Sequence, residues 1–253
     1  GGAGHPRLKW ELVFYRPIQN PHRGDGPARP PNPAASGAKV WAIGQAMALQ
    51  RTLDLLTSDA VGTAGAFPEL VFFDCHACHK PISDGDASLT WRANPLRALG
   101  PGVPVLNDSN LIMLIAAARV IDPLLADRLE DEGRALHAAS QLNRADFIAA
   151  ARRLSATADE MSARIMAADL SNRTAVAAIL AEVVSATQSE RYTDYAVAEQ
   201  ALFAVQRLSA DLGLGAGRVA AAIDRASRHA AGPYVYNQSE FRRSLAEIDG
   251  LLK

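Results

Sequence analysis

Cysteine is almost absent from this 253-residue chain, which has only Cys75 and Cys78. Two cysteines three positions apart cannot form the disulfide framework of a small secreted domain. An excess of positive or negative charge is also missing. The 26 basic residues are balanced by 27 acidic ones, and the formal net charge is −1. Nothing in this balance points to nucleic acid or to an anionic membrane surface as a partner.

Long hydrophobic runs are absent too, although 49% of the residues are hydrophobic. No uninterrupted apolar stretch approaches the roughly 20 residues that a membrane-spanning helix needs. Residues 1–4 are Gly-Gly-Ala-Gly and have neither the basic start nor the apolar centre of a secretory signal. The length and the apolar content suffice for one large domain or two small ones.

The two cysteines belong to the pentapeptide Cys75-His76-Ala77-Cys78-His79. This spacing is typical of covalent haem attachment. Each thiol adds to one vinyl group of the porphyrin, and two intervening residues let both sulfurs reach the same edge. The adjacent His79 then lies under the ring and can donate an imidazole nitrogen to the iron. The motif therefore predicts one haem c, held by Cys75 and Cys78, with His79 as the proximal iron ligand.

Two other interpretations of the cysteines stay open. A thioredoxin-like thiol-disulfide oxidoreductase also uses Cys-x-x-Cys, and residues 70–74 could form the strand that leads into it. That fold needs further strands, whereas the chain after Asn107 has helical periodicity. A structural zinc site needs four ligands, and one pentapeptide can hardly surround a tetrahedral ion.

The sequence around the motif resembles the multihaem c-type cytochromes, the cytochrome c-554-like group. The resemblance covers about residues 3–106. It rests on the motif and on Gly4-His5-Pro6-Arg7-Leu8-Lys9-Trp10-Glu11, Trp41-Ala42-Ile43-Gly44-Gln45, Phe73-Asp74-Cys75, Trp91-Arg92 and Pro101-Gly102-Val103-Pro104. Members usually carry several haem motifs, whereas this chain has one, which suits a single-haem relative or the C-terminal part of a longer protein. Lys80 stands where the family often has a second histidine.

The resemblance implies that His5 is the distal iron ligand, on the haem of its own chain or on that of a neighbour. His22, in the Pro- and Gly-rich stretch that follows, is the alternative. Arg7 and Arg92 are candidate partners of the haem propionates, since guanidinium groups bind carboxylates in a bidentate manner. Ordinary surface ion pairing is the simpler explanation of each arginine.

The remaining candidates for the sixth ligand have simpler explanations. His76 lies inside the haem loop and cannot easily reach the far face of the ring. His137 and His229 lie in helical stretches beside alanines, and we expect each to be solvated or packed. Among the methionines, Met113, Met161 and Met166 fit a helical core register, and Met47 lies on the predicted core face of an earlier helix.

The predicted fold is mainly α, with a loop-rich c-type haem-binding part at residues 1–106 and an antiparallel helical bundle at 107–253. In the first part, residues 38–56 predict a helix whose core face carries Val40, Ile43, Met47, Leu53 and Leu56. Gly44 lies on the wall of that helix, where it allows close approach of either a flat haem or a neighbouring helix. In the second part, caps and periodicity predict helices over 111–121, 123–139, from Asn143 to 165, from Ser171 to 184, from Thr193 or Asp194 to 208, 219–229 and 239–252.

Together these features predict an electron carrier rather than an enzyme. Two histidine ligands would leave no coordination site for a substrate and would give a lower reduction potential than a His/Met pair. Other cytochromes or redox subunits, or copies of this chain, are the expected partners. A periplasmic or extracellular location follows from the resemblance, with a signal peptide removed. A haem-based enzyme or gas sensor with an open sixth site is the alternative, and the thiol-disulfide oxidoreductase is the alternative if no haem is bound.

The His5 assignment can be tested by the His5→Ala substitution. If His5 ligates the iron of its own chain, its removal leaves the iron five-coordinate or water-bound, and the ferric optical spectrum becomes high-spin. An unchanged low-spin spectrum would eliminate His5. His22→Ala, examined in parallel, tests the alternative ligand.

Overall fold

The computed structural model describes residues 36–63, 65, 67, 69–74, 94–100, 102–186 and 191–253. This part of the chain is mainly α-helical, and its one β-type pairing is an isolated bridge between Phe73 and Leu106. The elements are α2 (Gly37–Thr57), η1 (Asp59–Thr63), η2 (Leu70–Phe72), α3 (Ser109–Ile121), α4 (Pro123–Ala139), α5 (Arg144–Ala167), α6 (Arg173–Ser185), α7 (Tyr195–Asp211), α8 (Gly217–His229) and α9 (Gln238–Leu252). The predicted helical bundle is confirmed.

Capping side chains fix where most of these helices begin. Asp122 accepts a hydrogen bond from the Leu125 N–H, and Pro123 occupies the first position of α4, where a missing N–H costs nothing. Asn143 caps α5 and Asp194 caps α7 in the same way, as the sequence predicts. The predicted cap of α6 was one residue too early: Asn172, not Ser171, accepts the hydrogen bond from the first turn.

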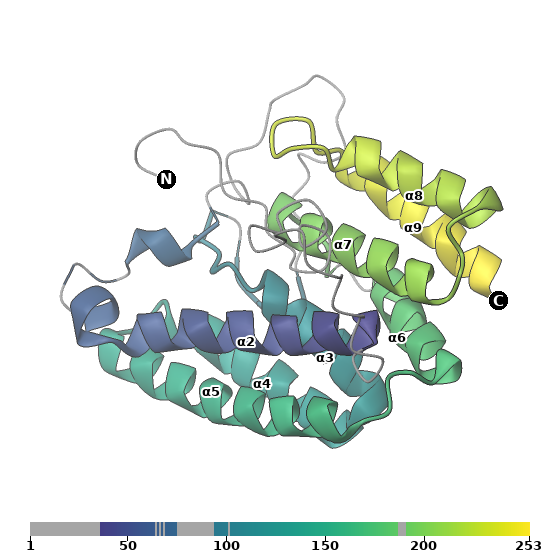
Figure 1. Cartoon of the computed structure of the whole chain (residues 1–253). Coiled ribbons are helices and arrows are strands. Elements are labelled where there is room, and N and C mark those ends of the chain that lie inside the picture. The colour runs from purple at the N-terminus through teal and green to yellow at the C-terminus, as the bar shows by residue number, and fades with distance from the viewer. Residues whose placement is uncertain are drawn as a thin grey trace, which may run out of the picture.

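The helices pack around one hydrophobic core (Figure 1). Helix α2 lies across the bundle and contacts α5, α3 and α7, while α3 lies against α4, α6 and α7. Helices α8 and α9 pack against each other at the C-terminal end of the chain. Helix α9 also contacts α6, and α8 contacts α7. Described residues on both sides of position 106 thus contribute to one core. The division of the chain at residue 106 stays a prediction.

Helix α2 buries a different face from the one that its sequence predicts. The residues against the core are mostly small, with Trp41 and three leucines filling the larger gaps; they are Ala38, Trp41, Ala42, Gln45, Ala46, Leu49, Leu53 and Leu56. Leu53 and Leu56 are therefore correctly placed. Ile43 is half-buried and packs against the edge of the core, Val40 is half-buried, and Met47 is 61% exposed. The helix carries two apolar faces, and close packing against α5 selects the one rich in alanine.

The methionine predictions have a mixed outcome. Met113 and Met161 are fully buried in the core, as expected. Met166 is not a core residue, because it lies in the last turn of α5 with 62% of its surface exposed. No helix in the described part of the chain combines the length and apolarity that crossing a bilayer requires.

If α2 is an integral part of the bundle, truncating its core face should destabilise the whole fold. Leu53 is 1% exposed, and we expect Leu53→Ala to lower the free energy of unfolding by about 2–5 kcal/mol through lost burial and a residual cavity. Urea unfolding followed by circular dichroism measures this. The control is Leu142→Ala, at an exposed turn between α4 and α5. Equally small decreases in the free energy of unfolding in both variants would show that α2 does not unfold together with the rest of the bundle.

Candidate functional site

The predicted site residues lie outside the described residues. This applies to Cys75, Cys78 and His79 of the haem motif, to the distal candidates His5 and His22, and to Arg7 and Arg92. These assignments therefore stay predictions. The structure does describe the residues on either side of positions 75–93, a stretch named here the haem segment after the predicted motif that it contains. Asp74 precedes this segment and Asn94 follows it, and both are buried.

The N-terminal end of the haem segment is held by a short antiparallel pairing. Phe73 forms the bridge with Leu106, and the Asp74 N–H donates to the Val105 carbonyl over 2.7 Å. The Asn107 N–H donates to the Phe72 carbonyl over 2.9 Å. Phe73 and Leu106 are both buried, so the pairing belongs to the core. The residue that precedes Cys75 is thus fixed at the base of α3.

The C-terminal end of the haem segment is held by a side chain. Asn94 accepts from the Leu96 N–H through Oδ1, over 3.0 Å, and donates through Nδ2 to the Arg191 carbonyl, also over 3.0 Å. Leu96 has no exposed surface, and its insertion into the core fixes the turn that follows Asn94. This end is therefore tied to the segment that leads into α7.

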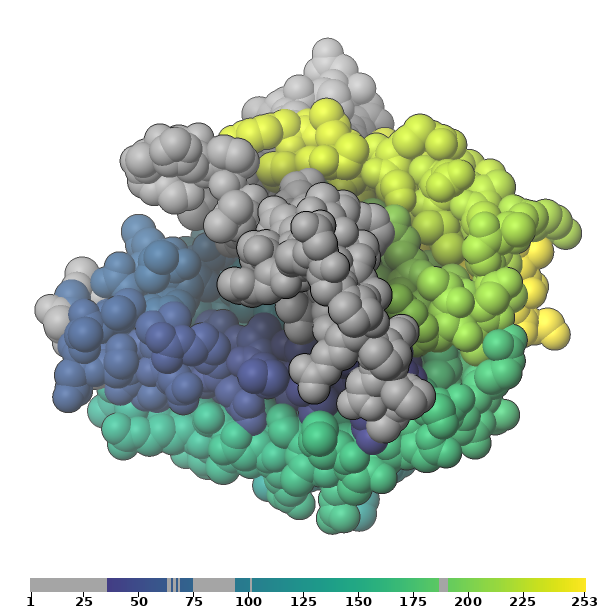
Figure 2. All heavy atoms as spheres, viewed as in Figure 1, coloured from purple at the N-terminus to yellow at the C-terminus, as the bar shows by residue number. Residues whose placement is uncertain are grey.

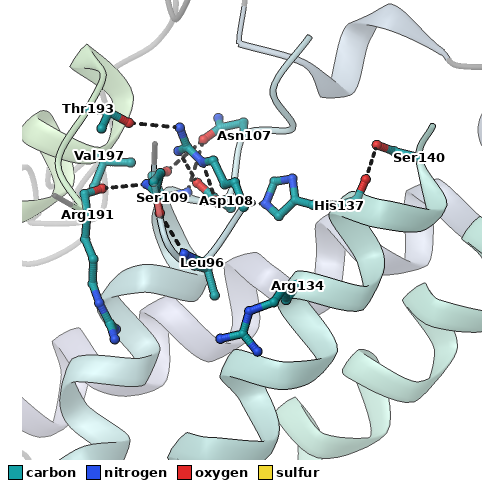
Figure 3. Close-up of polar contacts among 12 residues, drawn as sticks. Leu96, Asn107, Asp108, Ser109, Arg134, His137, Ser140, Arg191, Thr193 and Val197 are labelled. Carbon is teal, nitrogen blue, oxygen red and sulfur yellow. Dashed lines mark hydrogen bonds and ion pairs between the residues drawn. The ribbon is translucent and has the colours of Figure 1, made fainter. Parts of the chain in front are cut away.

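A buried ion cluster lies close in sequence to both anchors, and part of it is drawn in Figure 3. The Arg97 guanidinium binds Asp108 in a bidentate manner, with Nε to Oδ2 at 2.8 Å and Nη2 to Oδ1 at 2.5 Å. Its Nη1 donates to Asp194 Oδ2 over 2.7 Å and to the Thr193 hydroxyl over 3.2 Å. Arg97 lies three residues after Asn94, Asp108 starts α3 and Asp194 caps α7. One guanidinium therefore connects the turn that follows Asn94 with the starts of two helices.

The charges of this cluster are fixed by their neighbours. Burial by itself would raise the pKa of Asp108, but the charge of Arg97 and the hydrogen bonds from Arg97 and His137 outweigh burial. The pKa of Asp108 therefore lies well below its ordinary value. Burial would lower the pKa of Arg97, yet Asp108 and Asp194 raise it above its ordinary value. The guanidinium and the Asp108 carboxylate both stay charged across the physiological range.

His137 extends the cluster into the core. Its Nε2 lies 2.9 Å from Asp108 Oδ2, and the side chain is only 1% exposed (Figure 3). It also lines a cavity of about 20 Å³ together with Leu53 of α2, Phe72 and Leu106, which is room for roughly one water molecule. His137 is thus a packed histidine, one of the two environments that its sequence suggests. His229, in the last turn of α8, is half-buried.

Uncharged side chains link α2 to the same region. Gln45 accepts from Asn110 Nδ2 over 2.8 Å through Oε1, and its Nε2 donates to Gln200 Oε1 over 3.4 Å. Gln45 is buried, so these amides connect α2 with the first turn of α3 and the second turn of α7. The sequence signals Asn110 as part of a helix start, and Gln45 as part of the Trp-x-x-Gly-Gln stretch. Their contact across 65 positions is a property of the fold.

Sequence reasoning did not identify the Arg97 cluster. Arg97 lies in an unremarkable Pro-Leu-Arg-Ala stretch, and Asp108 reads as an ordinary cap residue. A buried ion pair has no local pattern, because its partners are brought together by helix packing. Comparisons with family models, with curated proteins and with solved structures found no match to this chain.

Removing Arg97 should be costly because two carboxylates then lie buried without their counter-charge. We expect Arg97→Ala to lower the free energy of unfolding by about 3–5 kcal/mol at neutral pH. Arg128→Ala is the control. Arg128 is half-exposed, so the loss of its ion pair with Glu160 should cost less than about 1 kcal/mol.

The Arg97→Ala deficit should depend on pH. The depressed pKa of Asp108 stabilises the native protein above the carboxyl's unfolded value of about 4, and this contribution is lost as the pH falls below it. The difference between wild type and variant should therefore be largest near neutral pH and shrink towards pH 3. Urea unfolding at a series of pH values measures it, and a deficit that does not change with pH would contradict this assignment.

Proposed function

We propose that this protein is an electron carrier with one covalently attached haem c. The observation that carries the proposal is the Cys75-His76-Ala77-Cys78-His79 motif, which contains every cysteine of the chain. Cys75 and Cys78 form the thioether bonds, and His79 supplies the proximal imidazole. The loop-rich part of the chain up to residue 106 is the haem-binding part, and the helices beyond it are an antiparallel bundle.

The haem supplies one-electron redox chemistry when bound, and the protein sets its environment. His5 is proposed as the distal ligand, with His22 as the alternative. Two imidazole ligands occupy both axial positions, exclude substrate from the iron and favour a low reduction potential. Arg7 and Arg92 are proposed to bind the propionates, whose negative charges would otherwise be poorly compensated next to the protein.

The anchoring of the haem segment supports this proposal. A carrier that exchanges one electron works best when its surroundings change little between the two oxidation states. The residues that flank positions 75–93 are held close in sequence to the buried cluster around Arg97. Asp74 is held by its hydrogen bond to Val105, and Asn94 by its hydrogen bond to the Arg191 carbonyl. A short segment with fixed ends can hold a covalently attached ring at one place on a rigid helical bundle. Thioether bonds would fix the ring to that segment.

A single haem is useful only when a second redox centre comes close. The proposed partners are therefore other cytochromes or redox subunits, including copies of this chain. Covalent haem attachment implies a periplasmic or extracellular location. The proposed role is that of a carrier and not of an enzyme.

Haem content decides this proposal. The protein should be produced with the machinery that attaches haem c and examined as its reduced pyridine haemochrome against protein concentration. We expect the α-band of haem c at one haem per chain, retained after acid–acetone extraction. The Cys75→Ala/Cys78→Ala variant should lose it. If the wild type carries no haem, the cytochrome assignment fails, and a thiol titration of Cys75 and Cys78 would test the oxidoreductase instead.

Carbon monoxide separates the carrier from the haem enzyme or gas sensor. If the reduced iron has two histidine ligands, the optical spectrum of the protein should not change when carbon monoxide is added. Rapid formation of a carbon monoxide complex would show an open or weakly held sixth site and would overturn the bis-histidine assignment.

A further inference from the structure

One ring nitrogen of His137 is not used by the buried ion cluster. The Nε2 atom lies 2.9 Å from Asp108 Oδ2, whereas the Nδ1 atom is buried and has no hydrogen-bond partner among the described residues. Because Asp108 is ionised beside Arg97, its oxygens only accept, and the proton in this contact belongs to Nε2. Nδ1 is an acceptor if the ring is neutral and a donor if it is charged. In either state it needs a partner, since buried polar side-chain atoms are normally hydrogen-bonded.

The ring of His137 borders a cavity between α2, α3, α4 and α5. The volume of this cavity is about 20 Å³, which is enough for one water molecule. Its wall consists mostly of leucine side chains, with polar groups from Thr52, Asn107, Asp108 and His137. A purely apolar cavity stays dry, whereas a cavity with two or more polar partners can hold an ordered water. The polar groups on the wall therefore decide what this cavity contains.

Thr52 and Asn107 both have hydrogen-bonding capacity that suits a water molecule. The Thr52 hydroxyl donates to the Ala48 carbonyl over 3.0 Å, so its oxygen can still accept. The Asn107 Oδ1 accepts from the N–H and the hydroxyl of Ser109, and its Nδ2 can donate. Together with His137 Nδ1, these groups give a water three partners, the usual number for a buried water.

The cavity approaches solvent at two of its lining residues. Thr52 and Asn107 are partly exposed, whereas the other lining residues are buried. Thr52 belongs to α2, which lies on the near face of the molecule above the teal atoms of α5 (Figure 2). A water molecule can therefore enter the cavity at its edge, although the His137 side chain is only 1% exposed.

We infer that this cavity is a binding site for one ordered water molecule, which bonds His137 Nδ1 and links it to Thr52 and Asn107. The water satisfies the one ring nitrogen that the ion cluster leaves without a partner. A larger ligand does not fit the volume, and an apolar one would leave Nδ1 unpaired.

The water extends the ion cluster to a fourth helix. Arg97 bonds Asp108 at the start of α3 and Asp194 at the start of α7. Asp108 in turn bonds His137 of α4. The water carries this hydrogen-bonded chain on to Thr52 of α2. Helix α2 is then held by a polar link as well as by its apolar core face.

The same water belongs to the support of the haem segment. The Asn107 N–H donates to the Phe72 carbonyl, two residues before Asp74, which precedes the haem segment. The water site would therefore hold the Asn107 side chain next to this anchor. All the groups that bind the water lie outside the haem segment, so the inference does not rest on the proposed function and can fail or hold independently of it.

A crystal structure of the full-length chain, at a resolution that shows ordered waters, tests the site directly. We expect one water oxygen in the cavity, about 2.7–3.2 Å from His137 Nδ1. A cavity without a water, or an Nδ1 atom bonded to another group of the protein, would overturn the inference.

A substitution cycle tests whether the water links Thr52 to His137. Thr52→Val, His137→Phe and the double variant are made in the full-length chain, and thermal unfolding is measured for each. Thr57→Val is the matched control in both backgrounds. Thr57 is also a half-buried threonine of α2 whose hydroxyl donates over 3.0 Å to the carbonyl four residues earlier, but it does not line the cavity.

The expected result is a Thr52→Val effect that depends on His137. In the wild-type background, Thr52→Val should lower the unfolding midpoint by about 2–4 °C, because the water loses a partner. In the His137→Phe background the water has already lost its main partner, so the further decrease should be much smaller. Thr57→Val should behave alike in both backgrounds. A Thr52→Val effect of the same size in both, zero included, would overturn the link. If His137→Phe does not fold, the occupancy of the cavity in crystals of wild type and Thr52→Val decides the question: a water that is unchanged by Thr52→Val would likewise overturn the link.

Discussion

The bidentate pair between Arg97 and Asp108, extended to Asp194, is the interaction on which the rest of this structure depends. It is buried on all sides, so it can exist only if α3, α7 and the turn after Asn94 are already in place. Conversely, any displacement of these three elements would leave a buried charge without its partner, which would lower the free energy of unfolding by several kcal/mol. Such a cluster contributes to a single, well-defined arrangement more than to total stability. It also explains why both ends of the haem segment are fixed although they lie about 20 residues apart in the chain.

The hydrophobic core and the ion cluster have different tasks. The core of alanine, leucine and valine residues gives the bundle its stability, and its small side chains let α2 lie close to α5. The cluster and the amides around Gln45 determine which helix ends meet. Asp74 and Asn94, which flank the haem segment, both lie near these helix ends.

Much of the helical part of the fold follows from the sequence because its signals are local. Asp122-Pro123, Asn143 and Asp194 satisfy the free N–H groups of the helix that follows each of them, and they can do so wherever the helix finally packs. The buried face of α2 could not be predicted in the same way. This helix has two apolar faces, and only the shape of its neighbours decides which one is covered. The prediction that Met166 is a core residue was wrong for a related reason. Its position in the helical repeat fits the core, but the sequence does not reveal how far along α5 the neighbouring helices extend.

The haem motif is likewise a property of the sequence alone, because Cys75, Cys78 and His79 are neighbours in the chain and their spacing carries the chemistry. The sequence by itself therefore determined the helices, their beginnings and the proposed cofactor. The tertiary structure decided the partners of Arg97, the burial of His137 and the exposure of Gly44 and Met47. These depend on contacts between residues far apart in the chain. Such contacts arise from the packing of whole helices, and no local pattern of residues records them.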